Sequence, residues 1–83
     1  SKLAEPYWVK YEYKPELQDQ EIHTVTHSGQ EFDYILSGTM HIVIGKNDLV
    51  LHPGDSVYYD SRYPHAMQAV GEEPVQFLAI VIP

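Results

Sequence analysis

Apolar and polar residues alternate along most of this chain. Between positions 7 and 13, Tyr7, Val9, Tyr11 and Tyr13 occupy every second position, and the residues between them include Lys10. A period of two is typical of a half-buried β-strand, and only residues 16–21 could hold a helical turn. Alternation and β-branched residues together predict about eight short strands. They cover residues 7–13, 22–27, 32–36, 40–44, 49–51, 56–59, 65–70 and 75–82.

Turn-forming residues separate the predicted strands about every 8–12 residues. Clear examples are Ser28-Gly29, the run from Gly45 to Asp48, and Pro53-Gly54. Short strands with such regular turns indicate an antiparallel sandwich or barrel. Because the chain contains no repeat, linker or low-complexity segment, we expect one all-β domain covering residues 1–83.

Composition narrows the class of protein. The chain has 83 residues, of which 43% are hydrophobic and 20% charged, as in an ordinary globular domain. It has no cysteine, so disulfides and thiolate metal ligands are excluded, which agrees with the cytoplasmic location that we expect. An apolar run of about 18–20 residues, as a membrane span requires, is absent from the sequence.

The charge balance argues against direct contact with nucleic acid. The formal net charge is −7, from 12 acidic residues against five Lys and Arg. Such a surface repels phosphates rather than neutralising them. The chain begins with Ser1 rather than Met, and we expect that it was excised from a longer protein. Any contact with DNA would then be made by a separate N-terminal domain.

Three potential metal ligands fall at the ends of predicted strands. His27 ends one strand, Glu31 begins the next, and His65 begins a strand directly after Pro64. In a small barrel, inward-facing positions of different strands share a narrow interior, so these three groups can converge. Two imidazoles and one carboxylate suit non-haem Fe(II), and Mn, Ni or Zn could also bind them. The alternative is a metal-free polar cluster that binds an organic ligand directly.

Two segments resemble the two motifs of the cupin superfamily. The first runs from His27 through Glu31 to Gly38, and it is similar to the motif H-x-H, three or four residues, E, six residues, G. The second comprises Pro53-Gly54-Asp55 and the later Pro64-His65. The resemblance implies a small double-stranded β-helix, or jelly-roll, barrel. It also implies that His27, Glu31 and His65 are the metal ligands.

The chain departs from the cupin motifs at three places. Val25 stands where the first histidine of H-x-H would be, and Ala69 stands where an asparagine often follows the second-motif histidine. Residues 60–62 replace the usual P-x-G. A four-ligand cupin site is therefore absent. His23 does not simply replace the missing histidine, because two residues along a strand span about 7 Å.

Two groups of cupins resemble this chain in the run from His27 to Phe32 and in Pro64-His65. The first is the C-terminal domain of XRE-type helix-turn-helix regulators, whose resemblance continues to Gly38 and also includes Asp60-Ser61 and Pro83. This resemblance implies a domain that senses a small-molecule effector or a metal. The second is the iron-dependent hydroxypropylphosphonate epoxidases, which implies a mononuclear oxygen-dependent enzyme. A standalone binding or storage cupin remains a third possibility.

The remaining histidines and aromatic residues have simpler interpretations. His23, His41 and His52 are expected to be exposed or hydrogen-bonded positions of strands and turns. The aromatic strand over residues 7–13 has more apolar surface than a small barrel buries easily. We expect it to pair across a homodimer and so protect a sheet edge.

Overall fold

The computed structural model describes residues 3–83 and is built almost entirely of β-strands. Among these residues, no helix is long and apolar enough to cross a bilayer. The elements are β1 (Glu5–Tyr11), a 3-10 helix (Pro15–Leu17), β2 (Gln30–Ser37), β3 (Thr39–Ile44), β4 (Asn47–Leu51), β5 (Ser56–Asp60), β6 (His65–Val70) and β7 (Val75–Ile82). The predicted all-β fold is confirmed.

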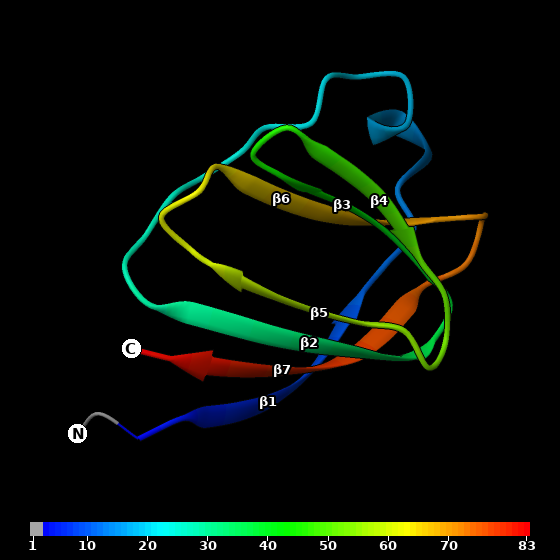
Figure 1. Cartoon of the computed structure of the whole chain (residues 1–83). Helices are drawn as coiled ribbons and strands as arrows, with labels where there is room; N and C mark the ends of the chain where they lie inside the picture. The colour runs from blue at the N-terminus through cyan, green and yellow to red at the C-terminus, as the bar shows by residue number, and fades with distance from the viewer. Residues whose placement is uncertain (1–2) are drawn as a thin grey trace.

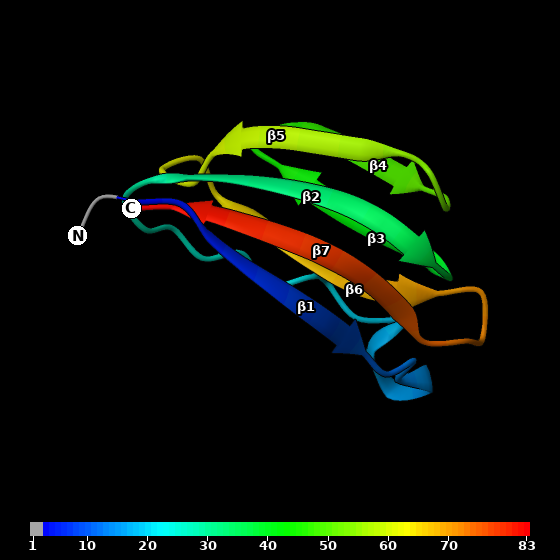
Figure 2. The ribbon, with the colours of Figure 1, turned by 90° about the horizontal axis from the view of Figure 1, so that it is seen from below.

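The strands form two antiparallel sheets that face one another. One sheet has the order β1-β7-β2-β5, and the other has the order β4-β3-β6. Figure 1 shows the three-stranded sheet above the four-stranded sheet, and Figure 2 shows the same two layers from below. The chain crosses between the layers at four connections, from β2 to β3, from β4 to β5, from β5 to β6 and from β6 to β7.

Alternation along the strands builds the core between the sheets. The four-stranded sheet contributes Ile35 from β2 and Val75 and Phe77 from β7, all at most 1% exposed. The three-stranded sheet contributes Met40 and Ile42 from β3, which are fully buried. Inward and outward side chains alternate along each of these strands, as a period of two requires. The register also turns Glu31 and His65 inward.

The outer face of the four-stranded sheet is unusually apolar. In one cross-strand row, Trp8 lies opposite Leu78, which in turn lies opposite Tyr34. Trp8 is 72% exposed. The outer apolar face, as we call it, consists of Pro6, Trp8, Phe32, Tyr34, Tyr58, Leu78 and Ile80. A contiguous apolar surface of this kind is uncommon on a monomer.

The predicted strand over residues 22–27 is wrong. Only Val25 bridges another residue, His65, through a pair of backbone hydrogen bonds of 3.0 Å. The segment has the β-branched composition of a strand, but a strand also needs a partner along its length. Beyond the bridge the backbone diverges, and the His27 amide donates instead to the Ser61 carbonyl. Propensity alone therefore did not determine this segment.

Gly38 makes the tight turn between β2 and β3 with a φ of +79°, and a β-carbon there would overlap the Pro74 carbonyl oxygen. We expect Gly38→Ala to lower the free energy of unfolding by about 2 kcal/mol, through backbone strain and this overlap. Gly54→Ala is the matched control, because Gly54 also has a positive φ, +91°, but open space around it. Urea unfolding should show a clearly smaller loss for Gly54→Ala; equal losses would contradict the steric argument.

Candidate functional site

Two loops at one end of the sheets position the predicted ligands. The Ser61 amide donates to the Gly29 carbonyl at 2.9 Å, and the Ser61 carbonyl accepts from the His27 amide at 3.0 Å. The Arg62 guanidinium lies 2.7 Å from the Asp60 carboxylate. By hydrogen bonding to it, Arg62 lowers the pKa of Asp60 to about 2. The loop before β2 and the loop before β6 are thus joined directly.

His27 and His65 lie side by side. Their ring centroids are 4.9 Å apart, and the ring planes are nearly perpendicular at 81°. His65 is only 4% exposed, since it begins β6 with its side chain turned inward, whereas His27 is exposed. The Tyr59 ring packs against His65 with centroids 5.1 Å apart. The two imidazoles that the sequence separates widely are therefore brought together, as predicted.

Backbone carbonyls select the tautomer of both imidazoles. His65 Nδ1 lies 2.8 Å from the Tyr63 carbonyl oxygen, and His27 Nδ1 lies 3.0 Å from the Ser28 carbonyl oxygen. A carbonyl oxygen only accepts hydrogen bonds, so each neutral ring carries its proton on Nδ1. The Nε2 lone pairs are then free. Metal-binding histidines are commonly oriented by just such a second hydrogen bond.

Glu31 lines the same cavity as the two histidines. It is half-buried on the inward face of β2, directly opposite Tyr59 of β5. The cavity has a volume of about 330 Å³, and we call it the histidine cavity. It is lined by Tyr11, His23, Val25, His27, Glu31, Tyr59, His65, Ala66 and Met67. A larger groove of about 840 Å³ runs past Lys46, Tyr58 and Tyr63 and contains none of the predicted ligands.

The three predicted ligands line one cavity, but their side chains are not positioned to coordinate one metal ion together. Within residues 3–83, no group of three or more His, Cys, Asp or Glu side chains is arranged to hold a metal ion. His27 and His65 are adjacent, and Glu31 lines the same cavity. Their donor chemistry fits a divalent cation, since two neutral imidazoles and a carboxylate are good ligands. The metal-ligand assignment stays a prediction.

Comparison with known proteins settles the family. The model of the family described as "Cupin domain" matches residues 10–81, which include both motifs and every predicted ligand. This chain belongs to the cupin family. A search of curated proteins found no match.

Solved structures agree with the cupin fold. Hydroxypropylphosphonic acid epoxidase from S. wedmorenis is 25% identical, with a TM-score of 0.75 over 95% of this chain and 43% of the epoxidase. A Thermus thermophilus protein is 20% identical, with a TM-score of 0.78, over 100% of this chain and 75% of that one. A Streptococcus pyogenes protein of unknown function is 24% identical, with a TM-score of 0.76, over 95% of this chain and 63% of that one. The chain thus spans less than half of the epoxidase.

The histidine cavity is also lined by His23, for which the sequence predicted no role in the site. His23 is exposed, as predicted, but its side chain also lines the histidine cavity. His23, Val25 and His27 take alternate positions along one segment, and all three line this cavity. The sequence contained this alternation. By contrast, His41 pairs with Asp48 and His52 lies near Asp55, away from the cavity.

Beneath Glu31 lies a polar cluster that sequence reasoning missed. Asp33 follows Glu31 by two residues on the inward face of β2 and is fully buried. Within the described chain, no hydrogen bond of good geometry reaches either Asp33 carboxyl oxygen, the Tyr59 hydroxyl or the Ser61 hydroxyl, although Glu31 lies close to Asp33 and Tyr59. Burial, and then the nearby Glu31 carboxylate, raise the pKa of Asp33 to about 9. The same causes raise the pKa of Tyr59, so its phenol stays protonated. The alternation that turns Glu31 inward also places Asp33 inward, and this was the available indication.

Proposed function

We propose that this cupin domain binds a divalent metal ion through His27, Glu31 and His65 and acts as the small-molecule sensor of a transcriptional regulator. One observation carries the metal part of the proposal. The two imidazole rings are adjacent, backbone carbonyls hold both Nδ1 atoms and so leave the Nε2 lone pairs available, and Glu31 lines the same cavity. Fe, Mn, Ni and Zn are all compatible with these donors.

The donor set also leaves room for an effector. When bound, a divalent ion held by two imidazoles and one carboxylate keeps coordination positions open for a small molecule. His23, Tyr11 and Met67 line the rest of the cavity and would contact that molecule beyond the ion. An effector that fits one conformation of this cavity better than another would shift the conformational equilibrium of the whole regulator.

The regulator part of the proposal depends on a domain outside this chain. The net charge of −7 makes direct DNA binding by this domain unfavourable, so an N-terminal helix-turn-helix domain would contact DNA in the cytoplasm. Support comes from the resemblance of Asp60-Ser61 and Pro64-His65 to the cupin domains of such regulators. The test is the complete reading frame, which is expected to encode a helix-turn-helix upstream of Ser1.

Metal loading of the wild-type protein tests the other part. After removal of bound metal and equilibration with Fe(II), Mn(II), Ni(II) or Zn(II), elemental analysis should find close to one ion per chain for at least one metal. A protein that stays empty with every ion would contradict metal binding, and the cavity would then be a site for an organic effector alone.

A second candidate function is a mononuclear non-haem oxygenase. The observation in its favour is the 25% identity to hydroxypropylphosphonic acid epoxidase over 95% of this chain. Among the described residues, however, no Lys or Arg lines the histidine cavity, so no cationic side chain would hold a phosphonate there. Oxygen consumption by the Fe(II)-loaded protein that depends on an added substrate would favour the enzyme.

We also propose that the domain forms a homodimer through β1 and the outer apolar face. β1 is an edge strand that pairs only with β7 within residues 3–83, and Trp8 on it is 72% exposed. A dimer contact that covers β1 and Trp8 would remove apolar surface from water and protect a sheet edge.

Light scattering at high micromolar concentration should give twice the chain mass of 9.5 kDa. Trp8→Lys should shift the protein to monomer, whereas Tyr63→Lys, an exposed aromatic outside this face, should not. A strictly monomeric wild type would contradict the proposal.

A further inference from the structure

We propose that the histidine cavity binds a small primary amine as its ammonium ion, with the nitrogen beside Glu31 and Tyr59. This inference uses the cavity of the proposed function but does not depend on the metal. A metal ion and an ammonium group would both require Glu31, so the two are expected to compete for the cavity.

The charges around the cavity favour a cation over an anion. Glu31 is the only acidic residue that lines the cavity in the described chain, and neither Lys nor Arg lines it. Within residues 3–83, Glu31 forms no ion pair. A carboxylate in a cavity, without a counter-ion, attracts a cationic ligand and repels a carboxylate or phosphonate.

Unpartnered polar atoms favour an ammonium ion that can donate hydrogen bonds. The Tyr59 side chain lines the cavity, the residue is only 6% exposed, and its hydroxyl forms no hydrogen bond of good geometry in the described structure, although Glu31 is nearby. A buried hydroxyl without a well-formed hydrogen bond carries a desolvation cost that a bound ligand can relieve. A primary ammonium has three N–H donors, and the Glu31 carboxylate and the Tyr59 hydroxyl offer acceptors on opposite strands.

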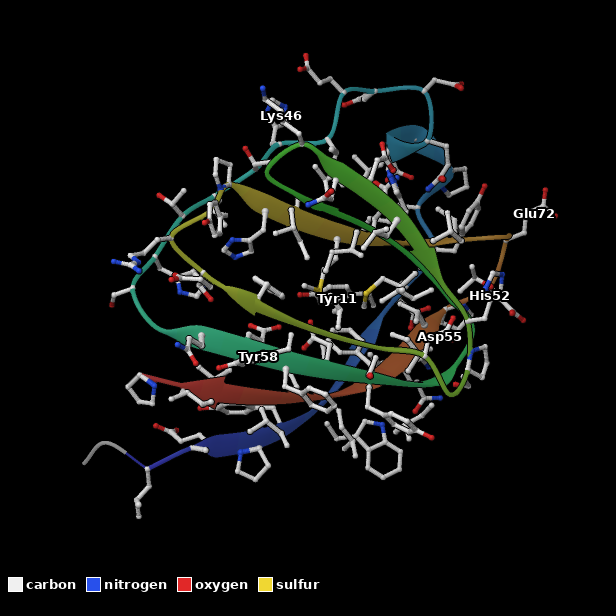
Figure 3. All side chains as sticks on the ribbon, in the orientation of Figure 1. Tyr11, Lys46, His52, Asp55, Tyr58 and Glu72 are labelled. Atoms are coloured by element: carbon white, nitrogen blue, oxygen red, sulfur yellow. The ribbon has the colours of Figure 1, made fainter. Side chains whose placement is uncertain are left out.

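Tyrosine side chains and the size of the cavity also favour a small cation. Tyr11 and Tyr59 line the cavity, and Figure 3 shows Tyr11 between the two sheets. The face of a tyrosine ring attracts a cation, which would add to the attraction of the carboxylate. At about 330 Å³, the cavity is at the lower end of the range for small-molecule sites. Tyr11 and Met67 offer apolar surface to a short alkyl chain.

Calorimetric titration of metal-free protein, with a chelator present throughout, tests the inference. Four probes of similar shape separate charge from hydrogen bonding: n-butylammonium, n-butyltrimethylammonium, butan-1-ol and butyrate. We expect n-butylammonium to bind at least tenfold more tightly than each of the other three, with butyrate the weakest. If the alcohol or butyrate binds as tightly as n-butylammonium, or if no probe binds, the inference is overturned.

Variants locate the interaction. Glu31→Gln should lower the affinity for n-butylammonium at least tenfold, and Tyr59→Phe, which keeps the ring, should lower it about fivefold. The control is Glu72→Gln, which removes the same charge at the far end of the sheets (Figure 3) and should change affinity less than twofold. An equal loss in the control would mean general attraction to an acidic protein and would overturn the inference. If Glu31→Gln does not fold, Tyr59→Phe decides the question.

The titration also distinguishes amine binding from metal binding. Because it is run with chelator, a protein that never loads metal can still bind the amine. A protein that loads metal normally but binds no amine overturns the amine inference and leaves the metal proposal standing.

Discussion

His65→Ala and Glu31→Ala are each expected to lower the affinity for a divalent metal ion by about 100-fold or more. Either change leaves two strong donors, which is too few to hold a divalent ion tightly. Fold stability should fall much less than affinity, since the sheets bury their apolar core independently of the ion. Affinity should also fall as the pH is lowered, because a protonated imidazole is not a donor. Ion content after matched loading, together with competitive chelator titration, measures these effects.

The control for these variants follows from the structure. His23→Ala is unsuitable, because His23 lines the same cavity. His52→Ala is better: His52 is exposed, and Figure 3 shows it beside Asp55 at the end of the sheets opposite the chain termini. It should load metal like the wild type. Normal loading by both ligand variants would disprove the ligand assignment, and a large loss in His52→Ala would show that the assay reports something other than the cavity.

Asp33→Asn is expected to stabilise the metal-free protein at neutral and alkaline pH. In the folded chain the pKa of Asp33 is raised from its ordinary 3.8 to about 9, first by burial and then by Glu31. Between these two pH values the folded state holds a proton that the unfolded state has released. The contribution of Asp33 to stability is therefore fully present below about pH 4 and is lost as the pH rises toward 9. Asparagine has no such titration, so we expect a gain of about 3 kcal/mol or more at pH 8.

Urea unfolding at pH 4, 6 and 8 measures this effect as the difference between variant and wild type. The difference should be small at pH 4 and should grow steadily with pH. Asp19→Asn, at an exposed position between the 3-10 helix and β2, should show no such trend. Equal stability of Asp33→Asn and wild type at all three values would mean that Asp33 ionises normally in the folded protein.

The sequence predicted the strands best where inward and outward residues alternate against a partner strand. In β3, for example, Met40, Ile42 and Ile44 are buried and the residues between them are less so. The prediction failed for residues 22–27, where composition favoured a strand but the chain meets only His65 across one bridge. Strand pairing depends on two segments, so the composition of one segment alone cannot predict whether it finds a partner strand.

The candidate site was partly predictable for the same reason. The expected convergence of His27 and His65 is found, with their rings 4.9 Å apart, although its premise that His27 ends a strand is wrong. The roles of His23 and Asp33 were missed. Alternation along the chain places His23 on the same side as His27, and Asp33 on the same side as Glu31. Whether such a side chain meets a partner, solvent or an unfilled space depends on packing across the two sheets. The buried, unpartnered state of Asp33 could be recognised only in three dimensions.

The irregular path of residues 22–27 determines how firmly one side of the histidine cavity is held. This segment lines the cavity with His23, Val25 and His27, but it is attached mainly by the bridge between Val25 and His65 and by the hydrogen bond from His27 to Ser61. A full strand would be held by a ladder of hydrogen bonds along its whole length. A segment held at a few points opens locally while both sheets remain folded. Exchange of the Val25 and His27 amide hydrogens should therefore be faster than exchange in β2 and β7, and it should slow when the cavity is filled.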